Sequence, residues 1–252
     1  TTPNGVAVGP DQKIWMVDTS SNYFFSFDPK TEEFTKYTTS IPTIDSYGNA
    51  SGVIKNPVSR PYWIEHYDGN LIMNEQTANR IGVFNPVTET LIEYTIPSRN
   101  PNWADCEGIE YCGVAQVFDF AVAGKKIWFT EWVENNIGVV DTSIPLSFST
   151  DFDTKEIILE KGQAAQVILK VTKANSSINE IIDVSVNTNL TSSFSDIVLK
   201  PELDNFSLSD DPISISVEIM VSEHALSGTH KVLLGAYTDD IAISQFVTVT
   251  IV

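Results

Sequence analysis

Residues 127–140, with the sequence IWFTEWVENNIGVV, decide the fold of the first half of the chain. This stretch opens with an apolar and aromatic run that ends at Glu131, turns at Asn135-Asn136 and returns as a second apolar run. Short runs of this composition, separated by a polar turn, predict two antiparallel strands. The pattern occurs twice earlier, with Asp18 and Glu75 in the place of Glu131, at intervals of 57 and 56 residues. A fixed period predicts a repeat architecture.

Each repeat extends to four expected strands joined by turns. The strands expected in the first repeat cover residues 5–8, 13–17, 23–27 and 34–37. Those of the second cover residues 62–65, 71–74, 81–84 and 91–94. The third repeat has its inner strand at 118–122, then the two strands of the opening stretch, with 141–149 in the place of a fourth, where Pro145 interrupts it. Tandem units of four antiparallel strands predict the blades of a β-propeller.

The repeats resemble the blades of the virginiamycin B lyase (streptogramin lyase) family of propellers over about residues 1–142. The resemblance rests on Gly9-Pro10-Asp11 ahead of Ile14-Trp15, on Asn79-Arg80-Ile81-Gly82, and on the strand that ends at Glu131. The connections 39–60 and 98–116 are longer than those of the family. Only three blades are visible, whereas closed propellers have about four to eight. We therefore expect a partial propeller at residues 1–149, with further blades upstream or in a partner chain.

The family opens a cyclic depsipeptide by elimination, with His and Glu residues and a divalent metal. The resemblance thus implies an alternative function, a lyase-like enzyme on a cyclic or esterified substrate with catalytic residues in further blades. We assign no catalytic residue in this chain. His66 is expected at a turn on the face opposite the closing acids, and His224 and His230 lie in the second half.

Asp18, Glu75 and Glu131 are weak metal-ligand candidates, for a divalent ion such as magnesium or calcium. Each would end the second strand of its blade, so together they could ring an ion at one face. An acid at the same position of every blade is also what a structural role requires, and we favour that interpretation. No cofactor is therefore expected.

From about residue 152 the sequence alternates Ile and Val with Ser and Thr, and aromatic residues become rare. Seven strands are expected, at residues 156–159, 165–172, 181–187, 196–200, 213–221, 231–238 and 244–252. This pattern predicts an immunoglobulin-like β-sandwich over residues 150–252, so the whole chain is expected to be all-β. The span resembles the Ig-like modules of bacterial and archaeal surface proteins, without the Cys-Trp-Cys core of antibody domains.

The chain of 252 residues has a net charge of −18, divided equally between its halves. Such a surface repels phosphate backbones, so a nucleic-acid partner is not expected. No apolar run is long enough to span a membrane. The chain shows no signal peptide and opens with Thr1-Thr2, which predicts a processed chain or one piece of a longer protein.

Sequons and cysteines indicate an extracellular or cell-surface location. N-glycosylation sequons start at four residues: Asn49, Asn175, Asn189 and Asn205. Cys106 and Cys112 lie six residues apart with no histidine near them, so a disulfide in an oxidising compartment is favoured over a metal pair. We predict that the two cysteines are bonded to each other and that the protein is exported and glycosylated.

The two long connections and the closing acids are expected on one rim, where aromatic residues could form a contact surface. These rim candidates are Trp63, Trp103, Tyr111 and Trp132, whereas Trp15 and Trp128 are expected in the core between blades. The predicted function is therefore an exported interaction or scaffold protein that contacts protein partners through its propeller rim and Ig-like domain. A carbohydrate-binding module that uses the rim tryptophans is a further alternative.

Overall fold

The chain is all-β, as its sequence predicts, in a computed structural model that describes residues 2–42, 58–98, 114–132, 134–174, 181–188 and 196–252. It divides into two compact units, Thr1–Ile144 and Pro145–Val252. All structural statements below concern the described residues. No helix among them is long and apolar enough to cross a membrane.

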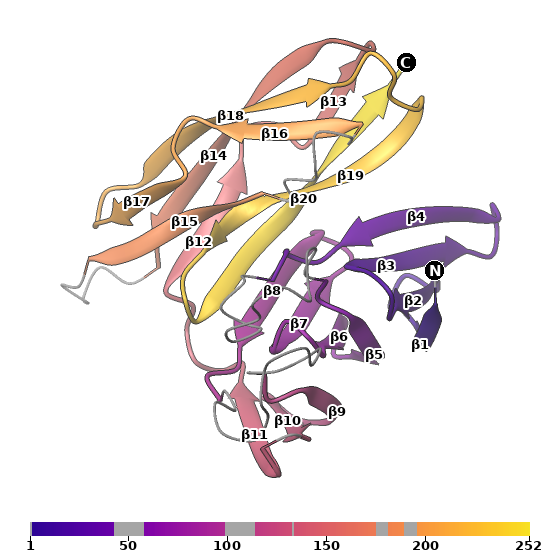
Figure 1. Cartoon of the computed structure of the whole chain (residues 1–252), viewed down its shortest axis with the longest axis vertical. Coiled ribbons are helices and arrows are strands. Elements are labelled where there is room, and N and C mark those ends of the chain that lie inside the picture. The colour runs from indigo at the N-terminus through magenta and orange to yellow at the C-terminus, as the bar shows by residue number, and fades with distance from the viewer. Residues whose placement is uncertain (1, 43–57, 99–113, 133, 175–180, 189–195) are drawn as a thin grey trace, which may run out of the picture. The chain divides into compact units, whose positions relative to one another are not determined.

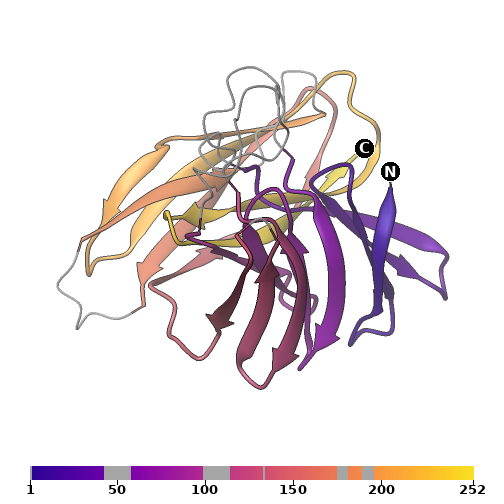
Figure 2. The ribbon, with the colours of Figure 1, turned by 60° about the horizontal axis from the view of Figure 1, so that its bottom comes forward.

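The first unit contains three antiparallel meanders in tandem (Figures 1 and 2). The first meander comprises β1 (Pro3–Val8), β2 (Ile14–Asp18), β3 (Tyr23–Asp28) and β4 (Glu33–Thr38). The second comprises β5 (Pro61–Tyr67), β6 (Asn70–Glu75), β7 (Arg80–Asn85) and β8 (Thr90–Thr95). The third comprises β9 (Val117–Ala123), β10 (Lys126–Glu131) and β11 (Asn136–Asp141).

The backbone itself repeats with the period read from the sequence. Left-handed backbone conformations recur at intervals of 56 or 57 residues, in the sets Gln12, Asp68 and Gly124; Glu32 and Glu89; Arg60 and Gln116; and Asn79 and Asn135. Few residues other than glycine adopt this conformation, and asparagine and aspartate do so most readily. The meanders are therefore structural repeats with matching turns as well as matching strands.

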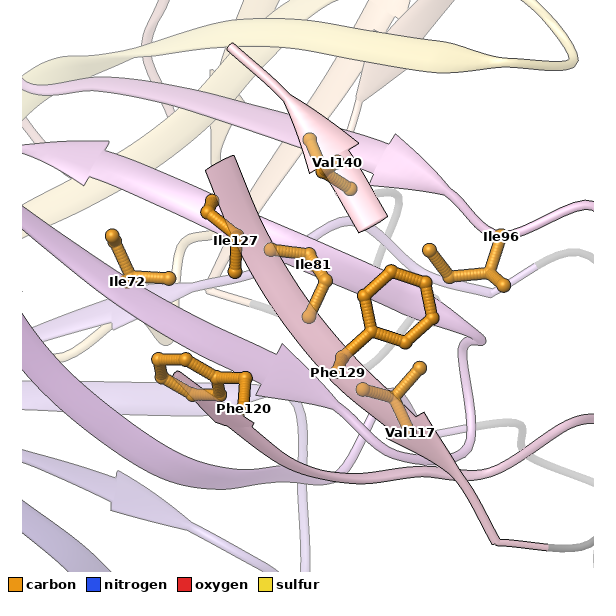
Figure 3. Close-up of a cluster of buried hydrophobic side chains, with 8 residues drawn as sticks. All are labelled: Ile72, Ile81, Ile96, Val117, Phe120, Ile127, Phe129 and Val140. Atoms are coloured by element: carbon orange, nitrogen blue, oxygen red, sulfur yellow. The ribbon is translucent and has the colours of Figure 1, made fainter. Parts of the chain in front are cut away.

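Neighbouring meanders pack face to face. We call the face on the side of the next meander in the chain the forward face, and the face on the side of the preceding meander the rear face. At the first junction, Trp15, Phe24 and Tyr37 on the forward face contact Phe84, with ring centroids 5.2–5.3 Å apart. At the second junction a buried cluster joins the second and third meanders (Figure 3); it contains Ile72, Ile81, Ile96, Val117, Phe120, Ile127, Phe129 and Val140. Trp15 thus lies in the predicted core.

Trp128 does not lie in the core, contrary to the sequence-based expectation. It is substantially exposed, although it occupies the position of Trp15 and Ile72 in the repeat. The reason is its place on the forward face of the third meander, where the described residues provide no following meander.

The second unit contains two sheets. One has the order β12 (Phe148–Phe152), β14 (Ala164–Lys173), β18 (Ile213–Val221) and β16 (Ile197–Pro201). The other has the order β17 (Asn205–Leu208), β15 (Ile182–Thr188), β19 (Gly228–Tyr237) and β20 (Ile241–Ile251), with β13 (Glu156–Leu159) parallel to β20. Contacts of β12 and β14 with β19 bring the two sheets together, and buried residues alternate along the strands, as in β18.

Two strand expectations need correction. Residues 141–149 do not form the fourth strand of the third meander, because β12 pairs with β14 in the second unit. Pro145 begins that unit, and alternate burial of Phe148, Thr150 and Phe152 fits its sheet. The boundary therefore lies at 144/145 and not at 149/150.

The four-residue strand β17 was not expected from the sequence, because it is too short to show a clear alternation.

Candidate functional site

One end of each sheet in the first unit, which we call the rim, collects the candidate residues. The strand register places Pro3 opposite Asp18, Pro61 opposite Glu75, and Val117 opposite Glu131. The starts of the inner strands β1, β5 and β9 and the closing acids therefore share the rim. The connections 39–60 and 98–116 run from an outer strand to an inner strand, so both rejoin the sheets there. Their residues 43–57 and 99–113 lie outside the described part of the chain.

Asn79 holds both ends of the second connection. Its side-chain Nδ2 donates to the carbonyl oxygens of Ile96 and Ser98, both at 2.8 Å. Its Oδ1 accepts the backbone N–H of Ala115 at 3.0 Å. Its left-handed backbone, with φ of 58°, is one that asparagine tolerates well. A single side chain in the β6–β7 turn thus fixes where the connection leaves and where it returns.

Asn22, the counterpart of Asn79 in the first meander, holds the first connection in a similar way. Its side-chain Oδ1 accepts the backbone N–H of Ser59, and its carbonyl oxygen accepts the N–H of Thr39 at 2.8 Å. Asn22 and Asn79 were not among the residues predicted to have a role. The available signal was an asparagine that recurs at positions 22, 79 and 135 with the repeat period.

Asp18 has a complete set of structural hydrogen bonds. Its carboxylate accepts the N–H groups of Thr2 at 2.7 Å and Ser20 at 3.0 Å, and the hydroxyls of Ser20 at 2.7 Å and Ser21 at 3.0 Å. Burial raises the pKa of Asp18, but these hydrogen bonds outweigh it and leave the pKa below its ordinary value. Asp18 therefore fastens the start of the chain to the end of β2.

Glu131 is also engaged in structural contacts. Its Oε1 accepts the hydroxyl of Ser98 at 2.9 Å, and its Oε2 lies 3.4 Å from the Nδ2 of Asn136. Ser98 is one end of the second connection, so Glu131 links the third meander to that connection.

Glu75 belongs to a buried charge cluster between the first and second meanders. The cluster contains Glu75, Arg80, Glu93 and Ser40, and Glu75 and Glu93 are fully buried. Arg80 Nη1 lies 3.9 Å from Glu75 Oε2 and 3.6 Å from Glu93 Oε1. Ser40 donates its N–H to Glu93 at 2.8 Å and its hydroxyl to the same carboxylate. Neither oxygen of Glu75 accepts a hydrogen bond from the described residues.

The pKa of Glu75 is raised well above its ordinary value. Burial is the largest cause, the Glu93 carboxylate is the next, and Arg80 opposes both in part. Two buried carboxylates beside one guanidinium leave an excess negative charge, which protonation of Glu75 removes. Burial and the second carboxylate thus favour the protonated form of Glu75, which lies in the interior between the two meanders.

The three closing acids do not assemble a metal site. Among the described residues, no three Asp, Glu, His or Cys side chains are placed to hold one ion. Asp18 and Glu131 are occupied by serine and backbone or amide donors, and Glu75 faces Arg80 and Glu93. These contacts fit the structural role that the sequence analysis favoured.

An exposed row of aromatic side chains lies at the rim. Ring centroids of Tyr62 and Phe118 are 5.2 Å apart, and those of Phe118 and Trp132 are 4.9 Å apart. Phe118, Trp132 and the neighbouring Trp63 are exposed. Asn4, at the same place on β1, donates through Nδ2 to the carbonyl oxygen of Tyr62 at 2.8 Å. The structure therefore brings the candidate Trp132 into a group with Tyr62 and Phe118, two residues that sequence reasoning had not included.

Several predicted site residues lie outside the described part of the chain: Trp103, Cys106, Tyr111, Cys112, Asn49, Asn175 and Asn189. Asn205 is described and is exposed at the start of β17, where its Oδ1 accepts the hydroxyl of Ser185 at 2.6 Å. The predicted disulfide and glycans remain predictions.

None of the three histidines lies at the rim. His66 is exposed near the end of β5 and pairs with Leu71, at the opposite end of the second meander from Glu75. His224 and His230 belong to the second unit, where His230 Nε2 lies 3.1 Å from the carbonyl oxygen of Leu226. The positions of these residues give no support to histidine-based chemistry at the rim.

The second unit has an open groove of about 620 Å³ beside β15 and β17. Its lining includes Asp183, Asn205, Tyr237, Asp239 and Asp240. The groove is acidic, and its residues show no grouping suited to one metal ion within the described chain.

No protein-family model matches the chain, and no curated protein matches its sequence. Among solved structures it is similar to the crystal structure of the S-layer protein SbsC domains 4 and 5. The alignment covers 100% of both chains at 13% identity, with a TM-score of 0.30. A score of that size does not assign a shared fold.

Proposed function

We propose that this chain is an exported cell-surface or extracellular interaction protein that binds a protein partner through the rim of its first unit. In this proposal the first unit is part of a β-propeller built from lyase-like blades, and the second is an Ig-like sandwich. The interaction depends on the rim aromatics and on the connections that rejoin the sheets beside them.

Strand arrangement supports the propeller part of the proposal. The inner strands of successive meanders are neighbours, β1 beside β5 and β5 beside β9. Asn74 connects them, because its Oδ1 accepts the N–H of Trp63 at 2.7 Å and its Nδ2 donates to the carbonyl oxygens of Val117 and Phe118 at 2.8 and 2.9 Å. Inner strands grouped side by side are what a propeller places around its central channel.

Strand pairing in the second unit supports the Ig-like part. The order β12-β14-β18-β16 corresponds to strands A, B, E and D of an Ig domain, and β15-β19-β20 to strands C, F and G. The second unit differs from an Ig domain in one connection. The edge strand β16, which pairs with β18, comes before the edge strand β17, which pairs with β15, whereas in an Ig domain the strand beside strand C comes first. The proposed likeness is therefore to the sandwich architecture and not to every connection of the Ig fold.

The exposed aromatic row is the observation that carries the proposed interaction. Large aromatic side chains contribute much of the energy of protein interfaces when they become buried there. Tyr62 and Phe118 each follow the end of a long connection by two residues. A partner that covers the row would therefore also meet both connections.

The same row favours carbohydrate binding as a second candidate, because exposed ring faces can stack on sugar rings. The lyase alternative receives no comparable support, since all three histidines lie away from the rim. The strongly negative chain continues to disfavour a nucleic-acid partner.

The test is capture of partners on the immobilised protein from a surface extract of the source cells, with rim variants alongside. Phe118→Ala and Trp132→Ala should each weaken capture at least tenfold, about 1.4 kcal/mol, which is typical of a moderate interface contact. Val87→Ala, an exposed apolar change in the β7–β8 turn, is the matched control and should leave capture unchanged.

Replacement of each connection by a short glycine-containing turn completes the test. Partner capture that persists unchanged in both aromatic variants and both replacements would refute the proposal. A glycan array separates the two candidates, because sugar binding that is lost in Phe118→Ala and Trp132→Ala would favour the carbohydrate module.

A further inference from the structure

The two junctions inside the first unit follow one rule: the forward face of one meander packs on the rear face of the next meander. On the forward faces, Trp15 of the first meander and Ile72 of the second occupy the same repeat position. On the rear faces, the second meander contributes Phe84 and the third contributes Phe129. The rule therefore predicts which surfaces of the chain should be covered and by what kind of surface.

The forward face of the third meander is apolar and uncovered. Trp128, Ile137 and Val139 are 44%, 75% and 45% exposed. Trp128 pairs with Val139, and Ile137 pairs with Thr130, so these side chains share one face of the sheet. Their repeat counterparts on the second meander, including Ile72 and Ile81, are buried against the third meander.

The rear face of the first meander is apolar and uncovered as well. Val6, Val8 and Phe34 are 63%, 54% and 65% exposed. Val6 pairs with Met16, and Met16 pairs with Phe25, so the face continues as an apolar surface across β1, β2 and β3. Its counterpart on the second meander contains Met73 and Phe84, both fully buried.

Resting on the proposed propeller, we infer that a second copy of this chain covers both faces. The forward face of the third meander in each copy packs on the rear face of the first meander in the other, by two equivalent head-to-tail junctions. The two three-meander arcs then close a six-bladed ring, within the usual range of about four to eight blades. Contacts of unlike faces close into a ring when the rotation between copies permits it.

One observation favours a second copy as the occupant. The chain presents both members of the face pair that already packs twice within it, so its two free surfaces are complementary in kind. One surface contains Trp128, Ile137 and Val139, and the other contains Val6, Val8 and Phe34.

The experiment measures the mass of the 252-residue chain by sedimentation equilibrium from 1 to 100 µM. We expect a dimer, with a mass twice the 27.8 kDa of one chain. Trp128→Glu and Val6→Glu should each weaken the dimer about 30-fold or more, as loss of an interface hot spot does. Val87→Glu is the control for an added exposed charge. Circular dichroism and thermal midpoints show whether each variant keeps its fold.

Mixing the variants tests the head-to-tail geometry. A dimer of Trp128→Glu with Val6→Glu retains one junction with both faces unaltered, so the mixture should associate more tightly than either variant alone. A contact between two like faces would instead respond to only one of the variants, and mixing would restore nothing.

Three results would overturn the inference: a chain that is monomeric at 100 µM, a dimer that survives both variants, or a dimer sensitive to only one of them. A monomer would leave both faces to further blades of the same polypeptide. Partner capture through the rim would stand in that case, and loss of rim binding with an intact dimer would refute only the proposed function.

Discussion

Glu75→Gln should remove the loss of stability that the buried charge cluster causes as pH rises. Glu75 is fully buried, and Glu93 and Arg80 are the ionisable groups that face it. In the folded protein its pKa is raised, chiefly by burial, so the folded state keeps a proton that the unfolded state releases above the ordinary glutamate range. The stability that Glu75 contributes is therefore fully present in acid and is lost as pH rises through its folded pKa. Glutamine does not titrate, so the variant lacks this loss.

The magnitude follows from one proton. Retention of a proton by the folded state alone changes the free energy of unfolding by about 1.4 kcal/mol per pH unit. Near pH 4 the variant should be within about 1 kcal/mol of the wild type, because the amide is neutral and close in size to the protonated carboxyl that it replaces. Above that pH the wild type should lose stability relative to the variant by up to about 1.4 kcal/mol per unit, until the folded carboxyl ionises.

Urea unfolding at half-unit steps from pH 4 to pH 8 measures this difference. Glu65→Gln, at a half-buried glutamate on β5, is the matched control for removal of one carboxyl group. A difference between wild type and Glu75→Gln that is constant with pH, or one that moves in favour of the wild type as pH rises, would refute the reasoning.

Three further changes test the fold around the rim. Asn79→Ala should cost about 1–3 kcal/mol, because buried backbone groups lose their partners, whereas Asn135→Ala, at an exposed left-handed position, should cost less in urea unfolding. Gly5→Ala should lower the thermal midpoint clearly, since an added Cβ would lie 2.8 Å from a backbone nitrogen of β5; an unchanged midpoint would show that the inner strands can separate. Cys106 and Cys112 should resist alkylation in the denatured, unreduced protein, and free thiols there would contradict the disulfide; its loss on reduction should cost about 2–3 kcal/mol.

Much of the fold follows from patterns of residues that lie close together in the sequence and recur along it. The apolar run that ends at Glu131 and its earlier copies predict the strands β2, β6 and β10 and the period that the backbone shows. Local alternation also predicts most strands of the second unit. These features depend on short-range periodicity, which the sequence displays directly.

The remaining features depend on contacts between distant residues. Glu75, Glu93 and Ser40 lie in three separate segments, and only the packing of two meanders buries Glu75 and raises its pKa. Trp128 has the same sequence context as Trp15, and its exposure follows from the absence of a following meander among the described residues. A repeat pattern predicts the strands of each meander, whereas the number of neighbouring meanders determines which of its faces are covered.

The hydrogen bonds of Asn22 and Asn79 make the stability of the sheets independent of the conformation of the rim connections. Each asparagine holds both ends of one connection, so the ends keep the same positions on the sheet whatever residues lie between them. The entropy cost of lengthening a closed loop grows only slowly with its length. These connections can therefore gain, lose or exchange residues at little cost to the meanders, much as the variable loops of a binding scaffold do. Mutational diversity in relatives should concentrate between the two ends that each asparagine holds.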